Sequence, residues 1–170
     1  FLVASGLSTA GSFAGITAKS WILIDGSNNP LLLALHFGAL ALPALVVSGP
    51  AGVLTDRMGS ESMLIRAQWG LFAAGVLGAL AIPICGGHLH LEMALLLLST
   101  LLVGIASTYE ITARSKYCAL LVDEAEQLPP YLASFSVVFN VGKLVGPPLG
   151  GALLALGGAT TALTLDAATY

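Results

Sequence analysis

The chain alternates long apolar stretches with short polar segments along its whole length. A helix that crosses the ~30 Å hydrocarbon core of a bilayer needs roughly 20 mostly apolar residues. Stretches of this kind cover residues about 1–24, 31–53, 63–85, 92–113 and 130–157, and a further apolar run extends from 161 to 170. The ten-residue alternation typical of membrane β-strands is not visible. The pattern predicts an all-α membrane protein with five full spans and the start of a sixth.

The composition agrees with lipid as the main solvent of the chain. Hydrophobic residues make up 56% and charged residues 9% of the sequence, and the mean hydropathy is +0.92. A soluble domain carries about 25% charged residues because its surface must meet water. The formal net charge of -3 gives no support to nucleic-acid binding. We therefore expect the lipid bilayer as a partner and no nucleic acid.

The polar segments between the spans fall into two groups according to charge. Asp25–Pro30, Gly86–His90 and Gly157–Thr160 contain no lysine or arginine. The remaining cations outside the middle of the spans lie in or next to the other two loops, and they are Arg57, Arg66, Arg114 and Lys116. Because cytoplasmic loops are enriched in lysine and arginine, this segregation predicts a multi-pass protein of the plasma or inner membrane with a cytoplasmic N-terminus.

Among the charged residues inside predicted spans, the candidates for a transport pathway are Lys143, Asp166, Lys19 and Glu110. A charge at mid-bilayer costs about 2.5–3.5 kcal/mol on insertion scales, so it usually faces protein or a water-filled cavity. Lys143 could face a cavity, bind an anionic substrate or pair with an acid such as Asp166, or it could be structural. Lys19 is nearer the outer end of its span and could reach water by snorkelling.

The two carboxyl groups among these four are candidates for carrying a coupling proton, because burial favours the uncharged form of a carboxyl group. Asp166 is the stronger candidate because it is farther from the loops. Glu110 stands four residues before Arg114, which favours an ion pair within one helix at the cytoplasmic surface.

The loop after the second span contains a glycine-flanked acid–base pair, Gly52-Val53-Leu54-Thr55-Asp56-Arg57-Met58-Gly59. Gly52 and Gly59 permit tight turns and close approach of helices. Asp56 could cap a helix or pair with a cation across a helix interface. The cluster formed by Gly52, Asp56, Arg57 and Gly59 is suited to a conformational latch between helix bundles. An ordinary charged turn that fixes topology is the alternative.

The fifth span contains the run Gly142-Lys143-Leu144-Val145-Gly146-Pro147-Pro148-Leu149-Gly150-Gly151. Glycines four residues apart flatten one face of a helix and let a neighbouring helix approach closely. Pro147 and Pro148 remove backbone donors and favour a bend where they lie. We expect Gly142, Gly146, Pro147, Gly150 and Gly151 to form a helix-packing gate. A kinked packing helix without a gating role is the alternative.

The two glycine-rich sequences also hint at an internal repeat. Gly49-Pro50 is followed by Gly52 in the second span, and Gly146-Pro147 precedes Gly150 in the fifth. These positions are separated by one three-helix unit. The spacing agrees with a three-plus-three arrangement of six spans.

At these two motifs the sequence resembles the major facilitator superfamily. Gly52, Leu54, Asp56, Arg57 and Gly59 match that superfamily's loop motif, whose two following basic positions are Ser60 and Glu61 here. The run from Gly142 to Gly151 is similar to its antiporter motif, with Ala133 in place of the first glycine. Residues 18–23, Pro43 and residues 165–170 are most similar to the enterobactin-exporter and macrolide-efflux-like branch.

The resemblance implies the N-terminal six-helix half of a twelve-helix secondary transporter, with a C-terminal half absent from this chain. It implies export of a small organic molecule, drug or metabolite, by proton antiport with alternating access. Two other functions stay open: a membrane sensor or scaffold that does not transport, and a membrane-embedded lipid-modifying enzyme. The enzyme would need clustered Asp, His or Ser groups at one membrane face, which the sequence does not provide.

The remaining polar residues predict no cofactor and no metal site. His88 and His90 lie near Glu92 in a predicted external turn, which is too few ligands for a typical metal site. His36 stands alone in its span and is expected to be a packing histidine. Cys85 and Cys118 lie in segments predicted at opposite faces of the membrane, so a disulfide between them is not expected.

Overall fold

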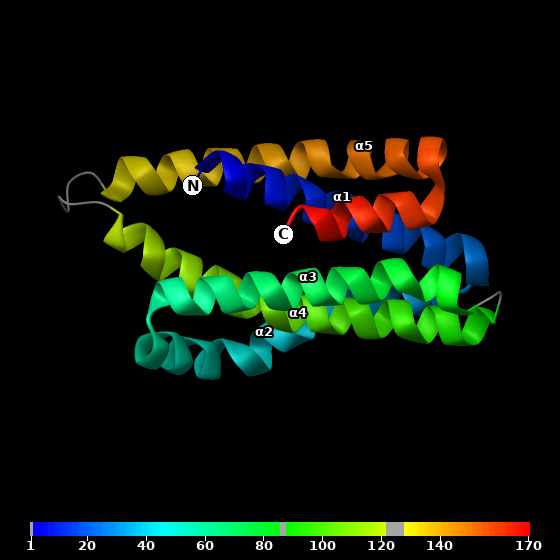
Figure 1. Cartoon of the computed structure of the whole chain (residues 1–170), viewed down its shortest axis with the longest axis horizontal. Helices are drawn as coiled ribbons and strands as arrows, with labels where there is room; N and C mark the ends of the chain where they lie inside the picture. Colours follow the sequence, from blue (N-terminus) through cyan, green and yellow to red (C-terminus); the bar gives the residue numbers. More distant parts are fainter. Residues whose placement is uncertain (1, 86–87, 122–127) are drawn as a thin grey trace.

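The structure is a bundle of five long helices (Figure 1). The computed structural model describes residues 2–85, 88–121 and 128–170. Within these ranges the backbone is helical almost throughout, as predicted for an all-α protein. The predicted turn at Gly86–His90 is described only from His88 onward. The helices are α1 (Leu2–Ser27), α2 (Pro30–Met58), α3 (Ser60–Cys85), α4 (Leu89–Leu120) and α5 (Leu128–Ala168).

Four of these helices are long and apolar enough to cross a membrane: α2, α3, α4 and α5. The predicted span at 1–24 forms the helix α1, but α1 does not reach the same apolarity. The reason is its many hydroxyl-bearing residues. Several of these hydroxyls donate to a carbonyl one turn earlier, as Thr9 does to Ser5 at 2.7 Å and Thr17 to Phe13 at 2.9 Å. Such bonds satisfy the polar groups of α1 within the helix itself.

The predicted fifth and sixth spans form one helix, α5, with a break inside it. The backbone at Gly158 is non-helical, with φ 75° and ψ 178°. Beyond this residue the chain reverses, and the last segment runs back beside α1 and the first part of α5 (Figure 1). α5 therefore consists of two helical segments that meet at Gly158, inside the predicted turn at 157–160. A single glycine turns the chain because only glycine adopts this left-handed conformation at little cost. Proline does not break α5, since the non-helical residue lies beyond Pro147 and Pro148.

Two short connections follow simple turn chemistry. Asn28 takes a positive φ of 52°, and the side chain of Asn29 accepts a hydrogen bond from the Leu31 N–H at 3.0 Å. Pro30 then occupies the start of α2, where the missing N–H is not needed. Between α2 and α3, Gly59 has a φ of 83°. These residues bring α1, α2 and α3 into antiparallel order.

Helix packing divides the bundle into two connected groups. α1 packs most extensively along α5, and α4 packs along both α2 and α3. α3 also contacts α5 and so joins the two groups. In Figure 1, α1 and α5 lie on one side of the bundle, and α2, α3 and α4 lie on the other.

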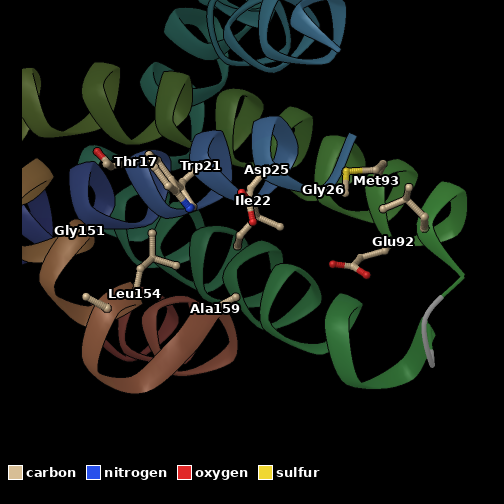
Figure 2. Close-up of a pocket in the computed structure, with 12 residues that line it drawn as sticks. Thr17, Trp21, Ile22, Asp25, Gly26, Glu92, Met93, Gly151, Leu154 and Ala159 are labelled. Atoms are coloured by element: carbon tan, nitrogen blue, oxygen red, sulfur yellow. The ribbon is translucent and has the colours of Figure 1, made fainter. Parts of the chain in front are cut away.

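A cavity of about 630 Å³ opens where the end of α1, the start of α4 and the α5 segments around Gly158 come together (Figure 2). Its walls are mainly apolar, with side chains such as Ile22, Met93 and Leu154. The carboxylates of Asp25 and Glu92 also line it.

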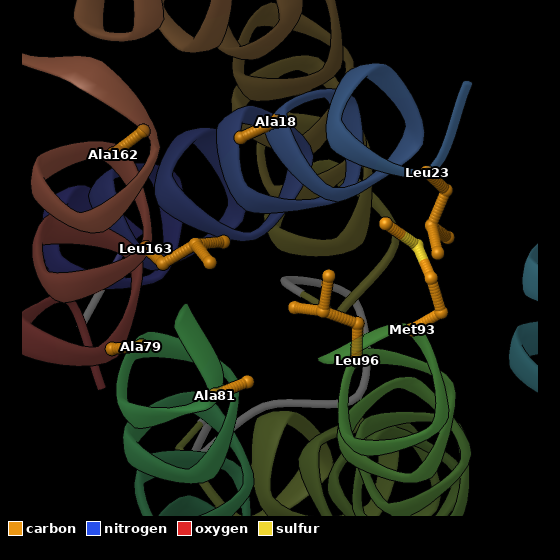
Figure 3. Close-up of a cluster of buried hydrophobic side chains, with 8 residues drawn as sticks. All are labelled: Ala18, Leu23, Ala79, Ala81, Met93, Leu96, Ala162 and Leu163. Atoms are coloured by element: carbon orange, nitrogen blue, oxygen red, sulfur yellow. The ribbon is translucent and has the colours of Figure 1, made fainter. Parts of the chain in front are cut away.

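The main apolar core lies between α1, α3, α4 and the last segment of α5 (Figure 3). Ala18, Leu23, Leu96 and Leu163 are fully buried in it. Small residues dominate on α3, which lets the helices approach closely. Many large apolar side chains remain exposed on the outside, for example Leu45 on α2 and Leu156 on α5, as expected for surfaces that meet lipid or other membrane helices.

Candidate functional site

A buried polar cluster lies beside this apolar core. Lys19 of α1 is only 3% exposed, so the predicted snorkelling to water is wrong. Its ammonium group donates to the Ser99 hydroxyl of α4 at 3.0 Å. Ser99 in turn donates to the Ala74 carbonyl of α3 at 2.9 Å. The lysine is therefore held by a hydroxyl group of α4 that is itself bonded to α3.

Asp166, on the last segment of α5, is the acidic member of the cluster. It is 4% exposed, interacts electrostatically with Lys19 and bonds to the Tyr170 hydroxyl. Its Oδ1 atom has no hydrogen-bond partner. Tyr170 lies 2.8 Å from the Ser12 hydroxyl of α1. Lys19 and Asp166 do not form a direct ion pair, since the pairs found in the described ranges are Glu110–Arg114 and Asp56–Lys116.

Two glycines make room for the charged groups. A Cβ atom added at Gly15 would overlap the carboxylate of Asp166. A Cβ atom at Gly78 would lie 2.7 Å from the Ser99 hydroxyl and 3.1 Å from Cε of Lys19. Since a real Cβ does not approach other atoms so closely, larger residues at either position would force the cluster to rearrange.

His36 of α2 is fully buried near the same region. Its Nδ1 lies 3.1 Å from the Thr100 hydroxyl, which also donates to the Leu96 carbonyl at 2.9 Å. The Thr100 hydroxyl has one proton and donates it to the Leu96 carbonyl. Its oxygen can therefore only accept a hydrogen bond from His36, which requires the proton of the imidazole to be on Nδ1. The expected packing histidine is thus held in one orientation by a hydrogen bond to α4.

Glu110 forms the predicted ion pair with Arg114. The side chains of the pair are buried within the bundle, with Glu110 8% and Arg114 7% exposed. Gln68 of α3 donates to Glu110 at 3.0 Å, and the Arg114 guanidinium lies 5.5 Å from the centre of the Phe135 ring. Glu110 is therefore bonded to Gln68 of α3 and to the Arg114 guanidinium. Its negative charge is balanced by a direct ion pair, which Asp166 lacks.

Lys143 lies apart from the buried cluster. It is on an exposed face of α5, and its ammonium group is 5.5 Å from the ring centre of Phe13 and 5.6 Å from that of Phe139. The alternative in which Lys143 pairs with Asp166 is not formed, because Asp166 interacts with Lys19 and Tyr170 instead.

Three glycines of the predicted gate form a flat surface against α1. A Cβ atom at Gly142 would lie 2.9 Å from Thr9, and one at Gly146 would lie 2.7 Å from the Ala10 carbonyl. A Cβ atom at Gly150 would overlap the Ala14 carbonyl. Gly151 differs, because a Cβ atom added there would have no other atom within 4 Å. The predicted close packing holds for the three glycines spaced four residues apart.

Two residues of the predicted latch between helix bundles, Asp56 and Gly52, contact α4 of this same bundle. Lys116 forms an ion pair with Asp56 and donates to the Gly52 carbonyl at 3.3 Å. Gly59 provides the turn into α3, while Gly52 is not at a close helix contact. Arg57 is exposed and belongs to neither of the ion pairs found in the described residues.

Comparison with known proteins identifies the family. The profile of the transmembrane secretion effector family, a group within the major facilitator superfamily, matches residues 1–170. The chain belongs to this family. The multidrug efflux pump Tap of Mycolicibacterium fortuitum is 28% identical over 160 residues, which cover 90% of this chain and 38% of the pump. The chain thus spans well under half the length of this relative.

Membership of the transmembrane secretion effector family, together with four helices apolar enough to span a membrane, makes this chain a multi-pass membrane protein. Sequence reasoning named Lys19 and Asp166 separately but missed that they share one cluster. It also missed Ser99, Tyr170 and Gly15 as their neighbours. The signal that could have pointed to them is the placement of small and hydroxyl-bearing residues within apolar runs, where polar groups need buried partners.

Proposed function

We propose that the full-length protein exports a small organic molecule across the cell membrane in exchange for protons. Two six-helix bundles would rock around a midplane site to give alternating access, and this chain would supply the N-terminal bundle. The remaining C-terminal bundle would be its principal protein partner. Substrate and protons are the small partners of the reaction, and no cofactor is required.

The arrangement of helix contacts supports a three-plus-three repeat. α1 touches both segments of α5, through Gly146 on the first and through Gly15 against Asp166 on the second. α3 touches the second segment, where Gly75 meets Ala167. In a three-plus-three repeat, α4 corresponds to α1, and α2 and α3 correspond to the first and second segments of α5. The repeat therefore requires α4 to contact both α2 and α3, and α4 does pack along both. This agreement supports the proposal of a six-helix major facilitator bundle.

The distribution of loop cations supports a cytoplasmic N-terminus. The ion pair between Asp56 and Lys116 joins the ends of α2 and α4, so the cationic ends of these helices lie at the same end of the bundle. Asp25 and Glu92 lie together at the other end, around the cavity. Segregation of the cations to one side is what the positive-inside rule requires.

The observation that carries the proposal is the buried pair of opposite charges, Lys19 and Asp166. Charged groups in a membrane interior are costly and usually serve transport. Oδ1 of Asp166 has no partner, so it is the atom on which a proton could be carried. A neutral Asp166 would leave Lys19 without its counter-charge. We propose that this change in electrostatic balance at the contact of α1, α3, α4 and α5 couples protonation to movement of the bundle.

The close contact of Gly142, Gly146 and Gly150 with α1 would hold α1 and α5 together as one rigid unit. This contact would seal the space between α1 and α5 beside the transport pathway. Sealing this space is the role proposed for the helix-packing gate. The Asp56–Lys116 pair would hold α2 against α4 in one transport state and release it in the other. Both roles use contacts that a small movement of the helices can make or break.

A cysteine at position 143 is expected to react with a membrane-impermeant thiol reagent when the full-length protein is in its open state. Lys143 is exposed on α5, and a charge at that depth is unfavourable against lipid. We therefore place it on the water-filled pathway between the bundles. The measurement is the rate of labelling of Lys143→Cys in membranes. Val141→Cys, at a similar depth on nearly the opposite face of α5 and 53% exposed, is the matched control. Equal resistance of both cysteines in every transport state would contradict this placement.

The substitution Lys116→Ala is expected to slow transport while lowering the free energy of unfolding by less than about 1 kcal/mol, because an exposed ion pair contributes little to stability. The pair is exposed, with Asp56 at 69% and Lys116 at 40%. The double exchange Asp56→Lys with Lys116→Asp should restore much of the rate, measured as initial efflux. Full activity of the single variant would argue for a simple charged turn.

The test of the proposal is transport by the full-length protein in liposomes. Substrates are first identified as compounds whose accumulation falls in cells that express the protein. An imposed pH gradient should then drive their movement, and a proton ionophore should stop it. Substrate movement that is indifferent to the gradient and the ionophore would exclude proton antiport. Absence of movement with every compound would favour the sensor or scaffold.

A further inference from the structure

The cavity shown in Figure 2 has the chemistry of a binding site for an organic cation. It is lined by Asp25 from the end of α1 and Glu92 from the start of α4, within a mainly apolar wall. No lysine, arginine or histidine is among its lining residues. Neither carboxylate belongs to an ion pair within the part of the chain that the structure describes. The cavity thus holds two acidic groups without a protein cation to neutralise them.

The other walls of the cavity suit the apolar body of such a ligand. Trp21 lines it from α1 and is 62% exposed, so its ring is available for a cation–π contact. Leu154 of α5 and Met93 of α4 complete the apolar surface. The volume of about 630 Å³ falls in the range of pockets that hold drug-sized molecules.

The same features argue against an inorganic cation. Calcium and magnesium need six or more oxygen ligands or a retained water shell. No group of three or more potential ligands is found among the described residues. A ring face and apolar walls add nothing to the binding of a small hard ion, but they contribute to the binding of a bulky cation.

We propose that this cavity binds a monovalent organic cation with an apolar body, Asp25 and Glu92 neutralising its charge and Trp21 facing its apolar part. The site would receive or release the cation at the end of the bundle opposite to Arg57 and Lys116. The inference deepens the proposed export function, on which it rests, by naming the class of molecule that is carried.

Tetraphenylphosphonium serves as the probe because it combines one positive charge with a large apolar surface. Its binding to the full-length protein in lipid nanodiscs is measured by equilibrium dialysis, with empty nanodiscs subtracted. Asp25→Asn combined with Glu92→Gln is expected to weaken binding by about tenfold or more, since each lost charge interaction is worth on the order of one tenfold step. Glu61→Gln, an acid at the start of α3 and not in the cavity wall, should leave it unchanged.

Tetraphenylborate, which has the same shape and the opposite charge, should bind the unsubstituted protein far more weakly than tetraphenylphosphonium. Equal binding of the two ions, or unaltered binding to the doubly substituted protein, would overturn the proposal. A second measurement does not depend on changing the acids: tetraphenylphosphonium should protect Thr17→Cys in the cavity wall from a thiol reagent. Labelling that the cation does not slow would also overturn it.

These outcomes are distinct from those that test transport. Binding is measured without a pH gradient, so its absence alongside gradient-driven export of other compounds would remove only the cation site. Binding that persists while no compound responds to a pH gradient would count against proton antiport and leave the site in place.

Discussion

Replacing Asp166 by asparagine is expected to reduce transport driven by a pH gradient to the level of protein-free liposomes. Asparagine has nearly the shape of aspartate but cannot carry a proton. Exchange of labelled for unlabelled substrate at equal pH needs no net proton movement, so it should persist. The measurement compares these two rates for the full-length protein.

The controls for this substitution separate coupling from folding. Glu61→Gln removes an exposed acid at the start of α3 and should leave both rates unchanged. Lys19→Met should behave like the Asp166 variant, because an aspartate without a nearby cation would stay protonated. Gradient-driven transport that survives in Asp166→Asn would show that another group carries the proton. Glu110 would then be the next candidate.

Adding one methyl group at Gly150 is expected to abolish transport, whereas the same change at Gly151 is expected to be tolerated. A Cβ atom at position 150 would overlap the backbone carbonyl of Ala14 on α1, while nothing lies within 4 Å of the one at position 151. Backbone cannot rotate away as a side chain can, so α1 and α5 must separate. Overpacking of this kind costs about 1–3 kcal/mol. The comparison is made on initial efflux rates and on thermal unfolding of the two alanine variants.

Gly146→Leu extends this test with a larger side chain. A Cβ atom there would lie 2.5 Å from the Phe13 side chain and 2.7 Å from the Ala10 carbonyl, so transport should be lost although the chain still inserts into the membrane. Equal activity of the alanine variants at 150 and 151 would contradict the close helix contact. Normal efflux by Gly146→Leu would show that the contact is not needed for transport.

The helices could be predicted from sequence because they depend on local composition. Long apolar runs with polar breaks leave few other structures possible in lipid, where every backbone group must be bonded within its own segment. The division at Gly158 was also visible as a short glycine-rich turn. Whether such a turn separates two helices or bends one depends on a few backbone angles, which composition does not determine. The limited apolarity of α1 was missed because its length alone met the requirement for a span.

The partners within the site could be predicted only where they are local. Glu110 and Arg114 are one turn apart on α4, so their ion pair followed from spacing. For Asp166 the sequence offered Lys143 as a partner, but Lys19 is the cation that it meets. That choice depends on the rotation of α1 and α5 about their axes, which no short motif specifies.

The glycine motif shows the same limit at the scale of single residues. Gly150 and Gly151 are neighbours in sequence, yet successive residues of a helix point about 100° apart. Only one of them can therefore face α1. The spacing of four residues between Gly142, Gly146 and Gly150 was the informative part of the pattern, and Gly151 did not belong to that face.

The most direct test of the proposed mechanism is the release of protons when the full-length protein binds an exported compound. In weakly buffered detergent solution with a pH indicator, the unsubstituted protein should release protons on substrate addition, and Asp166→Asn should release none while binding the compound. The same release from both proteins would contradict the claim that the buried carboxyl group beside Lys19 carries the coupling proton.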